Sequence, residues 1–156
     1  MNPCHCGYLG DGTGRCECTP GQLARYRNRV SGPLLDRIDL HVEVPQKSIA
    51  ALRRASPGES SAVVGERILL ARQRQLIRAG VPNARLDVQT LDYDCRLADE
   101  QADLSEIAAD RLGLSARAYD RVLKVARTIA DLEGSLQIDA PHLLEAIAYR
   151  VLDRVP

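Results

Sequence analysis

The sequence contains no tryptophan and no phenylalanine, and five tyrosines supply its whole 3% of aromatic residues. Leucine, isoleucine, valine and alanine must therefore build the core, which suits packed helices better than a sandwich of sheets. The sequence also lacks net charge, because 21 Lys and Arg residues balance 21 Asp and Glu residues. This balance argues against a module that coats nucleic acid with its whole surface, although a local basic patch could still bind phosphate.

There is no apolar run near the ~20 residues that a transmembrane helix requires, and no signal peptide. We therefore expect a cytoplasmic protein that has no membrane partner. In a reducing compartment, cysteines that cluster in the sequence favour a metal site over disulfides.

Residues 4–6 and 16–18 each have the pattern C-x-C, and nine residues that include four glycines separate the two pairs. Four thiolates on loops can close around a tetrahedral Zn²⁺, and glycine lets the backbone turn tightly beside the ligands. Four free thiols or two disulfides are the alternatives to a metal site. The ligands that we expect for one structural zinc ion are Cys4, Cys6, Cys16 and Cys18.

The chain contains one segment that indicates a strand and several that indicate helices. Residues 38–44 alternate apolar and polar side chains, so we expect a half-buried strand whose sheet is supplied from elsewhere. Thr19-Pro20-Gly21-Gln22 has the features of a helix start. Further helices are expected at 46–54, from Ser60 or Ser61 to Ala79, and at 89–95, 99–112, 116–132 and 140–152. Cys95 is expected in a helical core.

Four stretches of the sequence have a distinctive pattern. They are Met1-Asn2-Pro3-Cys4-His5-Cys6-Gly7-Tyr8, Gly14-Arg15-Cys16-Glu17-Cys18-Thr19-Pro20, Ser31-Gly32-Pro33-Leu34-Leu35-Asp36-Arg37-Ile38-Asp39-Leu40-His41-Val42, and residues 112–133. Together they resemble magnesium-chelatase-like AAA+ ATPases of the ComM/YifB (competence protein) type. The likeness covers nearly the whole chain in the order of the family, and it implies that the chain corresponds to the C-terminal part.

The resemblance implies a mainly α fold with three parts. Residues 1–45 would be a fragment of an αβα AAA+ core with a zinc loop, residues 46–85 linking helices, and residues 86–156 a helical lid domain. It also implies that the intact parent forms a hexameric ring, binds ATP and Mg²⁺, and acts on DNA in recombination or transformation.

Roles for three residues follow from the resemblance alone. Asn2 resembles the sensor-1 residue that positions the attacking water, and Arg37 resembles the arginine finger supplied to a neighbouring subunit. Arg117 resembles the sensor-2 arginine, which reaches the nucleotide from the lid. Without the resemblance, Arg37 would be a strand-flanking arginine paired with Asp36 or Asp39, and Arg117 an exposed residue of a first helical turn.

The chain departs from the family pattern because it has no G-x-x-x-x-G-K-[ST] motif and no acidic strand end before Asn2. We therefore expect the isolated chain to be inactive as an ATPase and monomeric, and we expect a truncated gene or a start at an internal methionine.

Two other functions compete with this interpretation. A free-standing zinc-containing module could contact DNA or a protein through Arg25, Arg27 and Arg29, although these arginines could equally form a solvated helix face. A magnesium-chelatase subunit that acts on a porphyrin is the third possibility, and the cysteine cluster argues against it.

Overall fold

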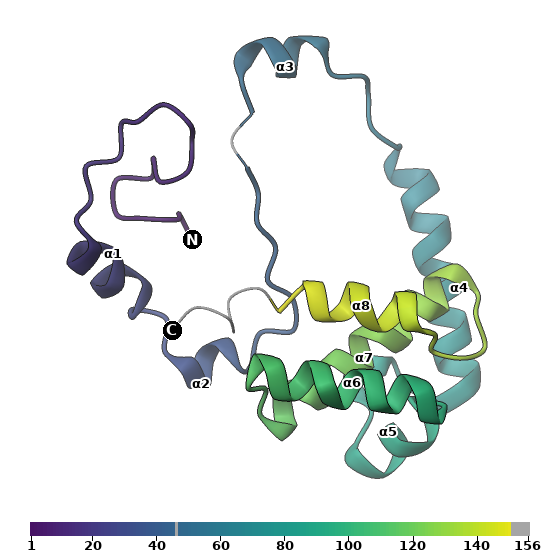
Figure 1. Cartoon of the computed structure of the whole chain (residues 1–156). Helices are drawn as coiled ribbons and strands as arrows, with labels where there is room; N and C mark the ends of the chain where they lie inside the picture. Colours follow the sequence, from purple (N-terminus) through teal and green to yellow (C-terminus); the bar gives the residue numbers. More distant parts are fainter. Residues whose placement is uncertain (46, 151–156) are drawn as a thin grey trace. The chain divides into compact units, whose positions relative to one another are not determined.

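The computed structural model describes residues 1–45 and 47–150 and divides them into two compact units. The first unit consists of Met1–Leu35 and Glu43–Ser56, and the second of Asp36–Val42 with the described residues from Pro57 onward. The protein is mainly α-helical, as the sequence predicts, and no β-strand occurs within the described ranges (Figure 1).

The first unit combines the cysteine-rich loop with three short helices, α1 (Pro20–Arg27), α2 (Gly32–Leu35) and α3 (Ile49–Arg54). The helix start expected before α1 is confirmed. Gln22 donates its backbone N–H to Thr19 Oγ1 at 3.3 Å, while the Gln22 side chain accepts the Thr19 N–H at 2.9 Å. None of the three helices buries a residue, so they form no apolar core among themselves.

The second unit contains the longer helices. The predicted helices of this unit are confirmed with ends that differ by at most one residue, except for the helix expected at 140–152. This helix ends at Ala148, Tyr149 and Arg150 are in a turn, and residues 151 and 152 lie outside the described residues. The elements are α4 (Ser61–Ala79), the 3-10 turn η1 (Asn83–Arg85), α5 (Val88–Asp94), α6 (Asp99–Leu112), α7 (Ala116–Glu133) and α8 (Ala140–Ala148).

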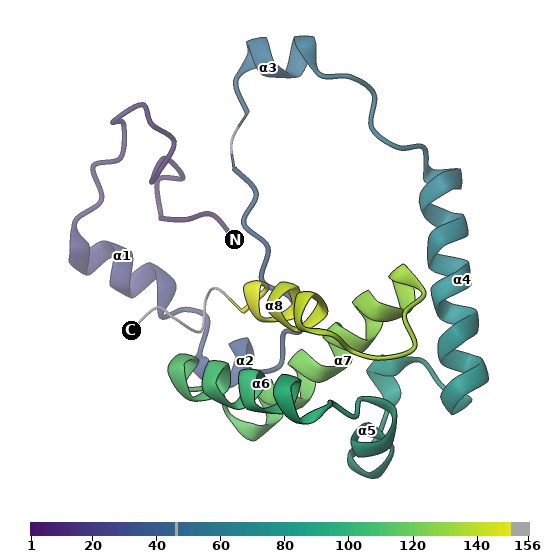
Figure 2. The ribbon, with the colours of Figure 1, turned by 45° about the vertical axis from the view of Figure 1, so that its right-hand side comes forward.

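The helix α7 is the centre of this unit and packs against α4, η1, α5 and α8 (Figure 2). Its buried apolar residues have the three-to-four spacing that places them on one face of the helix, and Arg127 and Asp131 are buried as well. Cys95 lies in the same core, as expected. The core residues are Leu86, Leu91, Cys95, Val122, Leu123, Ala126, Ile129, Ile138, Leu143, Ala146 and Ile147.

A buried polar network joins α4 to α7. Asp131 accepts hydrogen bonds from Arg78 at 2.7 Å and from Asn83 Nδ2 at 2.8 Å, and it forms an ion pair with Arg127 at 3.2 Å. Arg127 also donates to the backbone carbonyl of Ser135 at 2.6 Å, which ties α7 to the loop before α8. The network therefore fixes how α4, α7 and that loop sit together.

The prediction of a strand at 38–44 is wrong, because none of these residues is in a strand. The backbone N–H of His41 instead donates to the carbonyl of Tyr149 at 2.7 Å, and Arg150 donates to the carbonyl of Ile38. His41 is buried, whereas the apolar side chains of the segment are exposed. A strand needs a neighbouring strand to pair with, and the described part of the chain offers none.

Candidate metal centre and nucleotide-site residues

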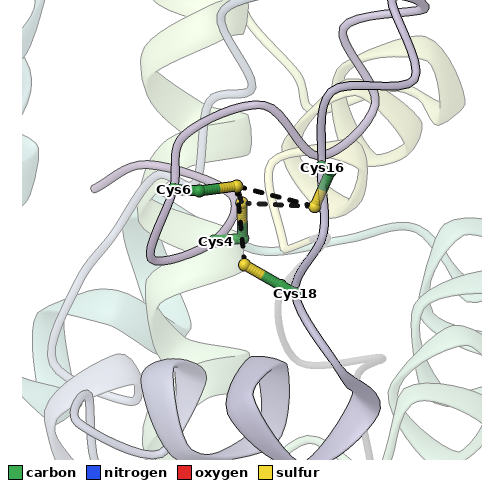
Figure 3. A group of neighbouring side chains, drawn as sticks. All are labelled: Cys4, Cys6, Cys16 and Cys18. Carbon is green, nitrogen blue, oxygen red and sulfur yellow. Dashed lines mark hydrogen bonds between the residues drawn. The ribbon is translucent and has the colours of Figure 1, made fainter.

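The four N-terminal cysteines converge, with two contributed by each side of the glycine-rich loop (Figure 3). Their Sγ atoms all lie within 4.8 Å of one another. Cys4 Sγ is 3.2 Å from Cys6 Sγ and 3.8 Å from Cys16 Sγ, and Cys6 Sγ is 3.7 Å from Cys16 Sγ and 3.5 Å from Cys18 Sγ. This arrangement is a group of sulfur ligands that could hold a metal ion.

The spacing of the sulfurs fits a tetrahedral metal better than disulfides. Zn–S bonds of about 2.3 Å in a tetrahedron place the sulfurs about 3.8 Å apart. Four of the six sulfur–sulfur separations, at 3.2 to 3.8 Å, lie near this value, and all six are within 4.8 Å. They are far longer than the ~2.05 Å of an S–S bond. All five cysteines are free in the structure, so none of the four clustered thiols is joined to another in a disulfide there.

The pKa values of the clustered thiols differ from one another. Burial, the largest influence, raises the pKa of Cys4, but hydrogen bonds from Cys6, Cys16 and the backbone outweigh it and lower the pKa to about 6. The pKa of Cys16 rises to about 12, because burial and its three thiol neighbours outweigh the larger favourable hydrogen bond from the Cys18 backbone. One thiolate therefore forms readily while a second is opposed, and a cation at the centre would relieve this repulsion.

Gly7 allows the loop to turn beside the ligands. Its φ of +85° lies in the left-handed region, and its N–H donates to the carbonyl of Cys4 at 3.2 Å. Asn2 Nδ2 would lie 3.6 Å from a Cβ at this position. Asn2, the predicted sensor residue, is thus an exposed side chain beside the turn. It lies in the first unit, whereas Arg37 and Arg117 belong to the second.

Arg117 lines a cavity of about 440 Å³ in the second unit. The side chain is exposed in the first turn of α7. Arg121 and Lys124 follow it at four and seven positions, on the same helix face, and line the same cavity. Asp39 also lines the cavity and forms an ion pair with Arg121.

Arg37 does not line this cavity, but both of its acidic neighbours contact α7. Asp36 Oδ2 accepts a hydrogen bond from Ser115 Oγ at 2.8 Å, and Asp39 pairs with Arg121. Arg37 itself is exposed. The helix α7 therefore carries Arg117 and also contacts both acidic residues beside Arg37.

Sequence reasoning missed Arg121 and Lys124 as members of the cavity. Their spacing from Arg117 was visible, because residues four and seven positions apart share a helix face. The partner of Arg121 was not visible, since Asp39 is 82 residues away in the chain. The contact of Ser115 with Asp36 was not visible either, because it spans 79 residues.

Comparison with known proteins matches nearly the whole described chain to one family. Residues 58–150 match the family described as "Magnesium chelatase, subunit ChlI C-terminal", and residues 1–52 match "Magnesium chelatase, subunit ChlI". The chain belongs to the magnesium-chelatase family. The matches follow one another along the sequence, with their border before α4, in the order that the resemblance implied.

Similar proteins place the chain nearer to one branch of this family. It is 47% identical to "Competence protein ComM" of Haemophilus influenzae and 46% identical to "Uncharacterized protein YifB" of Escherichia coli, over 156 residues in each case. It is 33% identical over 153 residues to "Uncharacterized protein Rv2897c" of Mycobacterium tuberculosis. The chain spans 30% of the length of each of these relatives and matches their C-terminal part.

The helices provide one further observation. Among residues 1–45 and 47–150, no helix combines the length and the apolar character that crossing a bilayer demands.

Proposed function

We propose that the chain acts as the C-terminal part of a magnesium-chelatase-like AAA+ ATPase, to which it contributes a zinc loop, an arginine finger and the helical lid. The observation that carries this proposal is the pair of family matches in series, with Arg117 exposed at the cavity of the second unit. In this arrangement Arg117 reaches the phosphates of a bound nucleotide from the lid, where its fixed charge is available to them.

Arg37 acts on a different nucleotide, held by the neighbouring subunit. Its guanidinium stabilises the charge that develops on the transferring phosphoryl group, and Asn2 orients the attacking water. The sequence has no phosphate-binding G-x-x-x-x-G-K-[ST] loop. The β- and γ-phosphates and Mg²⁺ are therefore held by another part of the parent assembly, and this chain alone does not hydrolyse ATP.

The parent is a hexameric ring that acts on DNA during recombination or transformation. The name "Competence protein" of the Haemophilus relative supports this step, together with the resemblance of residues 31–42 and 112–133 to ring ATPases. Within the ring, each subunit supplies Arg37 to its neighbour.

Zn²⁺ is the metal that the cysteine cluster would hold, with a structural role. Four thiolate ligands leave no open coordination position for a substrate, and four sulfurs suit Zn²⁺ far better than Mg²⁺ or Ca²⁺. When bound, the ion would cross-link the two sides of the loop between Cys4 and Cys18.

A chimera tests the nucleotide roles. The chain replaces the matching segment of the Haemophilus relative, and ATP binding and hydrolysis are measured at several ATP concentrations. Arg37→Ala should lower kcat by about 10³-fold or more with ATP binding retained, because a finger acts on the transition state. Arg117→Ala should weaken both binding and hydrolysis.

Arg72→Ala is the matched control, since Arg72 is an exposed arginine of α4. Its chimera should keep the parent values of kcat and KM. If Arg37→Ala and Arg72→Ala gave the same rates, Arg37 would not be a finger.

A second candidate function is a zinc-containing interaction module without nucleotide chemistry. The observation in its favour is that the four-cysteine cluster is complete within the first unit. Arg25, Arg27 and Arg29, exposed on or just after α1, would then contact DNA or a protein. If ATP hydrolysis by the chimera depends on Arg37 and Arg117, the first function is supported. If substitution of either arginine leaves hydrolysis unchanged, the second is supported.

A further inference from the structure

Arg37 lies between two acidic residues that are both held by the helix carrying Arg117. We infer that Ser115 and Arg121 are positioning residues for Arg37, and that α7 thereby holds the finger and the lid arginine in one fixed relation. The inference rests on the proposed roles of Arg37 and Arg117.

The first contact is made by Ser115, the N-cap residue of α7, whose hydroxyl forms two hydrogen bonds. Ser115 Oγ accepts the backbone N–H of Ala118 at 3.2 Å, which caps the helix, and donates its own hydrogen to Asp36 Oδ2 at 2.8 Å. The carboxylate of Asp36 thus lies at the N-terminus of an 18-residue helix, where the helix dipole favours a negative charge. Both hydrogen-bonding capacities of the Ser115 hydroxyl are engaged in ordering the helix start and the residue before Arg37.

The second contact lies two residues beyond Arg37. Asp39 pairs with Arg121, whose side chain is 27% exposed and is held among the walls of the cavity. Lys124, on the same face of α7, donates to the carbonyl of Leu86 at 2.6 Å. Lys124 is thereby engaged elsewhere, and Arg121 is the cation that holds Asp39.

Two backbone contacts hold the rest of the segment 36–42 in place. The His41 N–H donates to the Tyr149 carbonyl at 2.7 Å, and Arg150, buried in the second unit, donates to the carbonyl of Ile38. Arg37 is therefore flanked by anchors on both sides while its own side chain is exposed.

This geometry links two arginines that serve two nucleotides. Arg117 lies between Ser115 and Arg121 on one continuous helix, so a displacement of α7 moves the lid arginine and both anchors of Arg37 together. A finger is effective only when its guanidinium is held within about 0.5 Å of the productive position. Loosening the anchors should therefore lower the rate of phosphoryl transfer without removing any group that touches ATP.

Hydrogen exchange of the 156-residue chain tests the anchors without any nucleotide. In the Asp36→Ala/Arg121→Gln variant the His41 amide should exchange about tenfold faster, which corresponds to about 1.4 kcal/mol. The amides of Val122 to Ile129 should keep their exchange rates, because the core of α7 is unchanged. Asp110→Ala/Arg111→Gln, at two exposed residues of α6, is the charge-matched control and should change neither.

The chimera with the Haemophilus relative tests the positioning role. Asp36→Ala/Arg121→Gln should lower kcat about tenfold. Asp36→Ala/Arg121→Lys, which keeps the charge at position 121, should recover part of the loss, and so should Asp36→Ala combined with the exchanged pair Asp39→Arg/Arg121→Asp. Asp36→Ala alone, at a residue that does not line the cavity with Arg117, should lower kcat and leave KM for ATP unchanged.

The outcomes separate this inference from the function on which it rests. If Arg37→Ala lowers kcat but loosening both anchors does not, Arg37 is a finger and the anchors do not position it. An unchanged His41 amide in the double variant would overturn the inference directly. If Arg37→Ala itself leaves kcat unchanged, the proposed function is wrong.

Discussion

Asp131 is the residue whose removal should destabilise the second unit most. Its side chain is 1% exposed and accepts hydrogen bonds from Arg78 and Asn83, and it also pairs with the 2% exposed side chain of Arg127. In Asp131→Ala the carboxylate disappears while Arg127 stays buried. The charge of Arg127 then has only the carbonyls of Ser135 and Leu136 as hydrogen-bond acceptors in the surroundings just described.

The magnitude follows from that burial. Breaking a buried ion pair by removing one partner costs about 3–5 kcal/mol, because the remaining charge stays away from water. Burial, the main influence, already lowers the pKa of Arg127, and Asp131 opposes that effect. Arg78→Ala should cost less, about 2 kcal/mol, because its 24% exposed side chain is the more solvated partner and Asp131 keeps Arg127 and Asn83.

Thermal unfolding followed by far-ultraviolet circular dichroism measures the difference. For a unit of this size, about 1 kcal/mol shifts Tm by about 4–8 °C, so Asp131→Ala should lower Tm by about 20 °C. Asp110→Ala, on the exposed surface of α6, is the control and should change Tm by little. A loss below about 1 kcal/mol for Asp131→Ala would refute the view that the network holds α4 against α7.

Three further predictions concern the metal, the activity and α8. Protein purified under reducing conditions should contain about one zinc per chain, and Cys16→Ser should reduce this stoichiometry sharply; four freely titratable thiols without metal would contradict the site. The isolated chain should show no ATP hydrolysis above that of a matched blank, and turnover that follows the protein through purification would disprove this. His142→Ala should cost about 1 kcal/mol, because Nδ1 accepts the Asp139 N–H at 2.8 Å and Nε2 lies 3.0 Å from Glu133 Oε2. Exposed His5→Ala is its control, and equal unfolding temperatures for the two variants would contradict the capping role.

Helix ends were the most predictable part of the fold, because their signals are local. Ser115 caps α7 through its own hydroxyl, and Gly134 ends the same helix with a φ of +82°. Both signals involve residues within a few positions of the helix end. The cysteine cluster was predictable for the same reason, since the two pairs are separated by a short glycine-rich loop.

Contacts between distant residues were not predictable from pattern. The alternation of apolar and polar residues at 38–44 is typical of a strand. It does not show whether a second strand is present to pair with it. Nothing in the local sequence distinguishes Asp131 from any other aspartate in a helix. Its partner Arg78 is 53 residues away in the chain. The roles of Arg37 and Arg117 came from resemblance, because spacing alone does not distinguish a finger from a solvated arginine.

The two units are stabilised by different interactions, and the cysteine cluster matters most in the first unit. In the described part of the first unit Cys4 is the one buried residue, and α1, α2 and α3 bury none. Apolar burial therefore contributes little there, whereas the second unit has a continuous core around α7. Contacts among the sulfurs and the stacking of Arg15 on Tyr8 join the two sides of the loop. Binding of a structural zinc is worth about 10–16 kcal/mol in small zinc-dependent peptides. The cysteine cluster takes the place of a hydrophobic core in the first unit, so chelation should unfold the loop while the amides of Val122 to Ile129 remain protected.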